Sequence, residues 1–593
     1  MRLLLFLSLV TIPAISLARV DSTWVTEFEK SGGRRTPRYE ETLDYCRRLE
    51  KGSRWIRLTS FGISPQGRKL PLVILSKERA FDPASASRTG KAVILIQSGI
   101  HAGEIDGKDA SLMLMRDIGI TRGLARLLDS TILLIVPIFN VDGHERFGPY
   151  NRINQNGPEE MGWRVNAQNL NLNRDYMKAE TPEMRAMLRL FTAWLPDLYV
   201  DCHVTDGIDF QYDITYAVEP IPYLDPGVSA WIRGTLLPSA LPAVEKSGHK
   251  IFAYVFPRED RDLSKGLNGG ASTPRFSTGF AALQNRPAVL IETHMLKPYR
   301  MRVEATYQFL RAMIEVVNRN PSSLRAVVRK ADAAVIAAGT ASDRSFPLAF
   351  GIGKKSEPLL FLGVKQTKDL SPLSGGLLTR YSADTVSLMV PYYNEITVTD
   401  SATVPFAYII PPEWTFVPEK LRDHGIQMER LEKGEDLDVE SWKFTDVHFH
   451  ERPFEGRHMV TFAVAATRER RQFPAGSIVV RTSQRTGKLV LNLLEPKGPD
   501  SFVSWGFFDA VFEQKEYAES YVMEDVGEKL LDSDALLRKE YTEKVQADTS
   551  FVHNPGARLN WLYQHSPWRD PWQNVYPVRR IVSPVALSTT PLK

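Results

Sequence analysis

The sequence places a histidine and a glutamate three residues apart, and this pair is suited to metal binding. His101 and Glu104 follow an apolar run, with Ala102 and Gly103 between them. A histidine nitrogen and a carboxylate at this spacing reach one zinc ion when small residues keep the loop tight. Such a pair is common by chance, so a third ligand is needed to predict a metal site.

His203 supplies the third candidate. It ends the apolar run that starts at Leu198, so it should emerge at the edge of a sheet. Two histidines and one glutamate, with a fourth position open to water, form a catalytic zinc site in several hydrolases. The alternative is a core histidine bonded to backbone. We expect one zinc ion per chain, held by His101, Glu104 and His203.

Glu292 ends a second apolar run, residues 287–291. A carboxylate after five apolar residues must be paired or functional, because burying an unpaired charge is costly. As a general base it would take the proton of a zinc-activated water that attacks a carbonyl. The structural alternative is a salt bridge to Lys297 or Arg300.

A long segment between the candidate ligands carries two arginines of interest. It runs from the Asn140-to-Gly143 turn through Arg164 to the Asn173-Arg174 pair. Loops of this length are uncommon unless they are functional. The arginines suit an oxyanion or a substrate carboxylate, which a guanidinium binds through two parallel hydrogen bonds. Taken singly, each arginine is more often a solvated surface group.

The elements that position these residues have the pattern of an α/β domain. Strands are expected at residues 92–97, 131–138, 198–201 and 288–292, and helices at 106–118, 182–194 and 302–317. Alternating strands and helices predict a mainly parallel sheet flanked by helices. Sites in such sheets form at the carboxyl ends of strands, where all the candidate residues lie.

The pattern changes near residue 340. Short strand-like runs follow at 359–364, 406–410, 459–465, 476–481 and 488–494, without long helices between them. We expect a catalytic domain at 19–340 and a β-rich accessory domain at 341–593, with a helical patch at 524–544 and an aromatic tail. The aromatic cluster at 504–521 fits a binding strip or, more simply, a packed core.

Composition narrows the class of protein. Of the 593 residues, 43% are hydrophobic and 24% charged, as in ordinary globular proteins. Lys and Arg number 74 against 70 Asp and Glu, so no basic field argues for nucleic acid. The two cysteines, Cys46 and Cys202, do not reveal whether they pair.

The first residues read as an export signal. Met1-Arg2 precedes an apolar run, and Ser16-Leu17-Ala18 places small residues where a signal peptidase requires them. The run is shorter than the roughly 20 residues that span a bilayer, and no later segment qualifies. We expect a signal peptide at 1–18, cleavage near Ala18, and a secreted or periplasmic protein with no membrane span.

Together these motifs resemble the zinc carboxypeptidases related to carboxypeptidase A and the cytosolic carboxypeptidases. The order is His-x-x-Glu, Asn-x-Asp-Gly, Arg, Leu-Asn-Arg, a strand-end His and a strand-end Glu, within residues 40–320. The resemblance implies a mixed, mainly parallel sheet flanked by helices. It implies these roles for residues of this chain: zinc ligands His101, Glu104 and His203; general base Glu292; oxyanion arginine Arg164; and carboxylate-binding Asn173 and Arg174.

Two positions depart from that family's pattern. Asn171 stands where an aspartate usually orients a zinc histidine, so either metal affinity or ligand basicity should be lower. The family's mobile tyrosine has no counterpart between Asn268 and Glu292. Arg275 or Tyr254 are possible substitutes, and the sequence does not distinguish them.

The predicted activity is removal of a C-terminal residue from peptides that have a free C-terminus. One alternative is a zinc amidase or deacylase on the same scaffold, acting on cell-wall peptides or N-acyl amino acids. Another is a catalytically silent binding protein that uses the β-rich domain for recognition. Neither the preferred residue nor the oligomeric state follows from the sequence.

Overall fold

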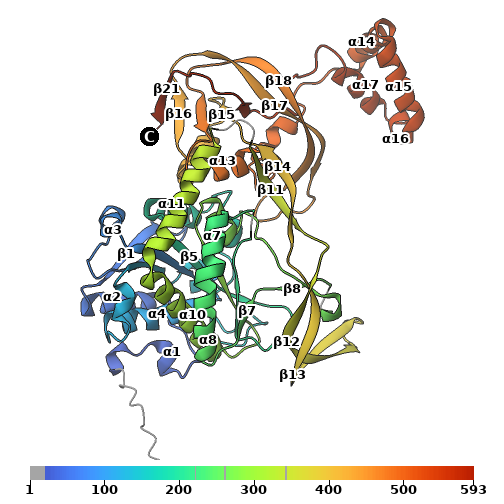
Figure 1. Ribbon diagram of the computed structural model, residues 1–593. Coiled ribbons are helices and arrows are strands. Elements are labelled where there is room, and N and C mark those ends of the chain that lie inside the picture. The colour runs from blue at the N-terminus through green and yellow to red at the C-terminus, as the bar shows by residue number, and fades with distance from the viewer. Residues whose placement is uncertain (1–20, 221, 260–261, 341–343, 593) are drawn as a thin grey trace, which may run out of the picture.

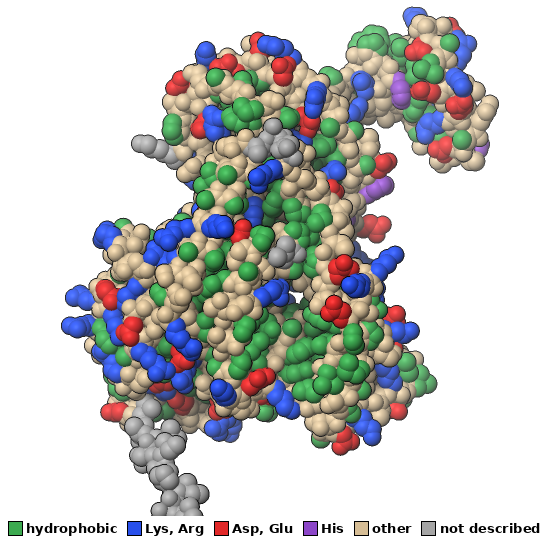
Figure 2. All heavy atoms as spheres, in the orientation of Figure 1, with side chains coloured by type: hydrophobic (Ala, Val, Ile, Leu, Met, Phe, Trp, Pro, Cys, Tyr) green, Lys and Arg blue, Asp and Glu red, His purple; other side chains and the backbone are tan. Residues whose placement is uncertain are grey.

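The computed structural model describes residues 21–220, 222–259, 262–340 and 344–592. The expected signal peptide at 1–18 lies outside these residues. Among the residues that are described, no helix is both long and apolar enough to cross a bilayer. Basic and acidic side chains are interspersed over the face seen in Figure 2, in keeping with the near-balanced composition.

An eight-stranded sheet forms the centre of the first half (Figure 1). In spatial order its strands are β1 (Ile56–Ile63), β2 (Lys69–Leu75), β4 (Thr131–Val136), β3 (Ala92–Ser98), β5 (Leu198–Thr205), β10 (Ala288–His294), β6 (Ile214–Ala217) and β7 (Ile251–Ala253). The central strands β4, β3, β5 and β10 run parallel, whereas β1, β2 and β6 join antiparallel. The expected mixed, mainly parallel sheet is confirmed.

Helices cover both faces of this sheet. They are α1 (Glu27–Lys30), α2 (Tyr39–Gly52), α3 (Pro83–Thr89), α4 (Asp106–Gly119), α5 (Val141–Glu145), α6 (Pro182–Trp194), α7 (Pro226–Trp231), α8 (Leu237–Lys246), α9 (Ser277–Leu283), α10 (Tyr299–Arg319) and α11 (Pro321–Ala338). Strand β5 shows the layering, because Cys202 faces Gly107 of α4 and Tyr199 faces Phe191 of α6. Successive strand residues point to opposite faces, and helices cover both faces. Every residue of β5 is therefore buried.

The second half is β-rich, as expected. Its elements are β11 (Ser345–Ile352), β12 (Glu357–Leu370), β13 (Leu377–Tyr393), β14 (Ile396–Thr403), β15 (Ala407–Ile410), α12 (Phe416–Asp423), β16 (Met428–Leu431), β17 (Glu435–Phe449), β18 (Val460–Phe473), β19 (Ile478–Arg481), α13 (Gly487–Leu494), β20 (Arg579–Ile581) and β21 (Thr589–Leu592). Seven of these strands form one sheet, in the order β18-β17-β20-β15-β19-β16-β21. The division of the chain near residue 340 stays a prediction.

One predicted strand is wrong. Residues 488–494 form helix α13 instead, with all its leucines buried. A short run that is apolar on every side shows no period, so a buried strand and a buried helix look alike in sequence. The helical patch is two helices, α14 (Ser520–Ser533) and α15 (Ala535–Ala547), because the Asp534 carboxylate accepts hydrogen bonds from the backbone N–H groups of Leu536 and Leu537 and starts a new helix.

The aromatic residues of the second half are divided between core and surface. Phe502, Trp505 and Phe508 are fully buried, which supports a packed core, and Tyr576 docks the tail by packing edge-on against Phe508. Trp568 remains two-thirds exposed. Helices α14, α15, α16 (Thr549–Val552) and α17 (Pro555–Gln564) lie apart from the main body at the upper right of Figure 1.

The two halves are joined by specific polar contacts. The buried Asp500 carboxylate accepts hydrogen bonds from the backbone N–H and the guanidinium of Arg275, which stacks on Trp505. Lys420 donates to the carbonyl of Lys178. Strand β13 also pairs in parallel with β9 (Leu267–Asn268), which in turn pairs with β8 (Phe256–Pro257). Residues distant in sequence therefore share one sheet.

We predict that Asp500→Ala destabilises the protein by about 3 kcal/mol, because it leaves the largely buried Arg275 cation without its counter-ion. Chemical denaturation measures this as a lower midpoint. The matched control is Asp438→Ala, whose ion pair with Arg470 is exposed and whose loss should cost about 0.5 kcal/mol or less. Equal midpoints for the two variants would contradict the predicted role.

Candidate active site

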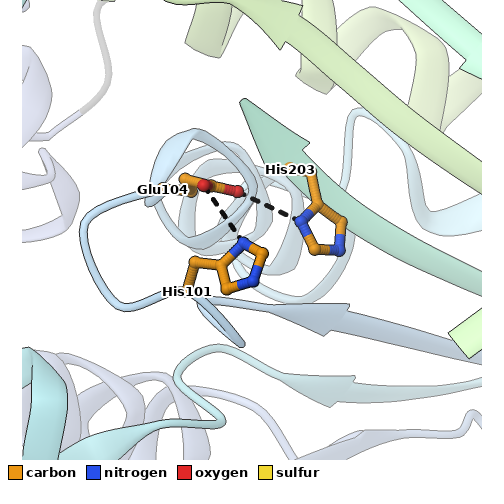
Figure 3. A group of neighbouring side chains, drawn as sticks. All are labelled: His101, Glu104 and His203. Carbon is orange, nitrogen blue, oxygen red and sulfur yellow. Dashed lines mark hydrogen bonds and ion pairs between the residues drawn. The ribbon is translucent and has the colours of Figure 1, made fainter. Parts of the chain in front are cut away.

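The three candidate ligands meet where β3 and β5 end. His101 and Glu104 lie in the turn between β3 and α4, and His203 lies near the end of β5 (Figure 3). Strands β3 and β5 pair in parallel, so their carboxyl ends open at the same edge of the sheet. At Gly103 a Cβ would lie 2.7 Å from the carbonyl oxygen of Gly162, so only glycine fits this turn without displacing the backbone.

Both histidines turn the same ring nitrogen to Glu104. The Nδ1 atom of His101 lies 3.1 Å from Oε1 of Glu104, and the Nδ1 atom of His203 lies 3.1 Å from Oε2. Candidate ligand atoms of all three residues lie within 4.8 Å of one another. All three side chains are buried, with at most 5% of each exposed.

The other nitrogen of each ring is already engaged. Nε2 of His101 lies 3.1 Å from the Asn171 amide oxygen, and Nε2 of His203 lies 2.8 Å from an Asp201 carboxylate oxygen. When both rings are neutral, as metal binding requires, and each donates from Nε2, the Nδ1 lone pairs face the carboxylate of Glu104. Nδ1 of His101 is buried and, although it lies 3.1 Å from Oε1 of Glu104, it makes no hydrogen bond of good geometry within the described structure. Lone pairs that converge on a carboxylate fit a cation, and two nitrogens with a carboxylate suit zinc.

The charges around the cluster favour an ionised Glu104. Burial opposes ionisation, but His101 and Arg152 hold the pKa of Glu104 well below its usual range. Burial lowers the pKa of His101 to about 4 and so keeps this ring neutral. For His203 burial acts in the same direction, yet the Asp201 carboxylate outweighs it and raises the pKa well above the usual value.

Glu292 stands beside this cluster. Strands β5 and β10 pair in register, with Glu292 directly opposite His203. Its Oε2 atom is buried without a hydrogen bond partner in the described chain, and burial raises the pKa of the carboxyl, although His203 opposes the shift. The salt-bridge alternative fails, because Lys297 pairs with Asp209 and Arg300 with Glu304.

The predicted arginines and asparagine border the same cavity, which measures about 410 Å³. Arg164 lies 3.3 Å from Oε1 of Glu104 and is 44% exposed on its side chain, so it can turn towards a substrate. Arg174 stacks on Phe276 and donates to the backbone oxygen of Asn173. Within the described chain no acidic side chain forms an ion pair with Arg174, which leaves its charge available to a ligand.

Three features of the site were not predicted correctly or completely from the sequence: Asp201, Arg152 and the residue that replaces the family's tyrosine. Asp201 was missed, although it precedes His203 by two residues on one strand and so had to share its face. Arg152, which lies 2.9 Å from Glu104, sits in a long loop and gave no sequence signal. Of the two substitutes considered for the tyrosine, Arg275 binds Asp500, whereas Tyr254 borders the cavity with its hydroxyl 2.9 Å from that of Thr205.

Comparison with known proteins agrees with this geometry. The family model of the zinc carboxypeptidases matches residues 42–223, a span that contains all three candidate ligands. Residues 42–223 are a zinc carboxypeptidase domain. The chain is accordingly an enzyme of the metallocarboxypeptidase type.

The similarity to known carboxypeptidases extends beyond the matched domain. Carboxypeptidase 2 of Trichophyton tonsurans is 23% identical over 502 residues, which cover 80% of this chain and 85% of the relative. The probable carboxypeptidase 2 of Arthroderma benhamiae is 24% identical over 486 residues, covering 79% and 86%. A metallo-carboxypeptidase structure from Pseudomonas aeruginosa aligns with a TM-score of 0.36 at 17% identity, covering 48% of this chain and 70% of that chain.

We predict that the purified protein binds one zinc ion per chain and that His203→Ala abolishes this binding. Asp201→Asn should weaken zinc affinity about 10- to 100-fold, because it removes the charge that orients His203. Elemental analysis and chelator competition measure both effects. The control is Asp213→Asn, which alters a similar pair with His249 outside the cavity and should leave zinc affinity unchanged.

Proposed function

We propose that this enzyme removes the C-terminal residue from peptides with a free carboxylate, using residues 19–340 as its catalytic domain. The observation that carries the proposal is the position of Arg174. This guanidinium, which forms no ion pair with any acidic side chain of the described residues, borders the same cavity as the three-ligand cluster and Glu292. A carboxylate is the group that such a guanidinium binds best, because two parallel hydrogen bonds can form.

Zinc held by His101, Glu104 and His203 would act as a Lewis acid that polarises the scissile carbonyl and acidifies water. Glu292 takes a proton from the attacking water as the C–O bond forms. It then delivers that proton to the peptide nitrogen as the C–N bond breaks, which yields a shortened peptide and a free amino acid. A carboxyl whose pKa is raised towards neutrality suits both transfers.

The remaining polar groups position the substrate. Asn173 and Arg174 hold the terminal carboxylate, which places the last peptide bond at the catalytic cluster. Arg164 stabilises the negative charge that develops on the carbonyl oxygen. Tyr254, whose hydroxyl borders the cavity, is our proposed counterpart of the missing tyrosine. We further propose that residues 1–18 direct the protein to export and are then removed.

We predict that Glu292→Gln lowers kcat by about 10²- to 10⁴-fold, the range typical of a lost general base. Zinc content should be unchanged, because the residue is not in the ligand set. Steady-state kinetics on a free-ended peptide, with elemental analysis in parallel, tests both points. A variant that keeps its zinc and most of its activity would rule out Glu292 as the base.

We predict that amidation of the peptide's C-terminus, or the change Arg174→Ala, lowers kcat/KM by at least about 10-fold, since either removes one half of a charge-assisted pair. The two changes together should cost little more than one alone. Product analysis by mass spectrometry provides the readout. Equal cleavage of amidated and free-ended peptides would instead favour a zinc amidase.

A further inference from the structure

Three leucines are exposed together at the tip of the hairpin that β12 and β13 form, at the lower right of Figure 1. Leu370 is 75% exposed, Leu373 97% and Leu377 71%. A single exposed leucine is normal on a protein surface, whereas a group of them marks a surface that contacts a partner or a membrane. The tip therefore carries apolar side chains that the described chain does not cover.

The base of the same hairpin is firmly packed. Phe361 of β12 and Val390 of β13 belong to one buried cluster with Leu267 of β9. Strand β13 also pairs with β9, and residues 270–273, which follow β9, line the catalytic cavity. The hairpin is thus an arm whose base is joined to the wall of the catalytic cavity and whose tip is free.

Hydrogen bonds hold the turn at the tip in one shape. The Ser371 hydroxyl accepts from the backbone N–H groups of Leu373 and Ser374, at 3.2 Å each. The backbone N–H of Ser371 donates to the carbonyl oxygen of Gly376. Gly375 has a φ of 68°, which glycine adopts without strain. Because the turn is already ordered, the leucines can bind without a large loss of conformational entropy.

Basic side chains lie a short way behind the leucines on both faces of the hairpin. Leu370 pairs directly opposite Leu377, so these two side chains share one face. Lys368 lies on that face, two residues or roughly 7 Å behind Leu370. Arg380 lies three residues behind Leu377 and so projects from the opposite face. An apolar tip with cations set back by this distance matches the depth of a lipid headgroup layer, into which apolar side chains insert by about 5–10 Å.

The charge at this end of the hairpin is positive and available. Within residues 365–380 the basic residues Lys365, Lys368 and Arg380 outnumber the acidic ones, of which Asp369 is the single case. All three basic side chains are exposed, and no acidic side chain of the described chain forms an ion pair with them. A surface of negative charge would therefore attract the tip.

The size of the apolar tip argues against a second copy of the chain as its occupant. Three leucine side chains present far less area than the roughly 800 Å² per partner that a standard protein interface buries. Two such tips in contact would also bring their basic side chains together, and like charges repel. A bilayer needs no matching surface, since its acyl chains close around a small apolar projection.

We propose that the tip of the β12–β13 hairpin docks this protein on anionic lipid membranes. Leu370, Leu373 and Leu377 enter the outer part of the acyl layer, and Lys368 and Arg380 bind the lipid phosphate groups. The catalytic cavity, joined to the base of the hairpin through β9, is then held at the membrane surface. This inference goes beyond the proposed peptidase activity and does not depend on it.

The test measures sedimentation of the purified protein with vesicles of phosphatidylcholine, with or without anionic phosphatidylglycerol. Wild-type protein should bind the anionic vesicles, and added salt should weaken this binding. Leu373→Ser should lower the partition coefficient about 10-fold, because it removes one buried apolar side chain. Lys368→Gln and Arg380→Gln should each lower it about 5-fold on anionic vesicles alone.

The matched control is Leu536→Ser, which changes a leucine of α15 that is 66% exposed and should leave vesicle binding unchanged. Melting temperature and cleavage of a soluble peptide should be the same in every variant, so lost docking is distinguished from lost folding. Wild-type protein that does not bind anionic vesicles, or Leu373→Ser that binds them as wild type does, would overturn the proposal. A dimer that Leu373→Ser dissociates, without vesicle binding, would overturn it in favour of a second copy. None of these results bears on the peptidase activity.

Discussion

The in-register parallel pairing of β3, β5 and β10 is the constraint on which the site depends. It sets Cys202 opposite Ser98 and Glu292 opposite His203, so three strands end at one edge. A shift of β5 by one residue would turn His203 to the other face of the sheet, away from Glu104. The pairing is secured by burial, because β5 is covered on both faces and no residue of it can reach solvent without cost.

Much of this arrangement could be predicted from the sequence. Apolar runs that end in His203 and Glu292 are typical of buried strands, and the helices over 106–118 and 182–194 have clear periodicity. The ligand loop was predictable only together with His203, because a histidine and a glutamate three residues apart are common by chance. The roles assigned to these residues go further than their positions, and they stay proposals.

Other contributors could not be predicted, for physical reasons. Arg152 reaches Glu104 from an irregular loop whose path depends on tertiary contacts. Helix α13 was mistaken for a strand because a fully buried run carries no amphipathic period. A hydrophobic period arises only when a helix or strand has one exposed face, so it cannot identify an element that is buried on every side.

The pairing of β13 with β9 bears on how the chain can be divided. If the polypeptide were cut near residue 340, β9 would keep β8 as a partner but lose β13, and its backbone groups on that side would be unpaired. The segment from Asn171 to Lys178 would also lose the hydrogen bonds it makes with Glu455, Lys420 and His424. A shortened chain would therefore be prone to self-association through its open strand edge, however complete its ligand set. The catalytic half and the β-rich half should therefore be expressed together as one chain.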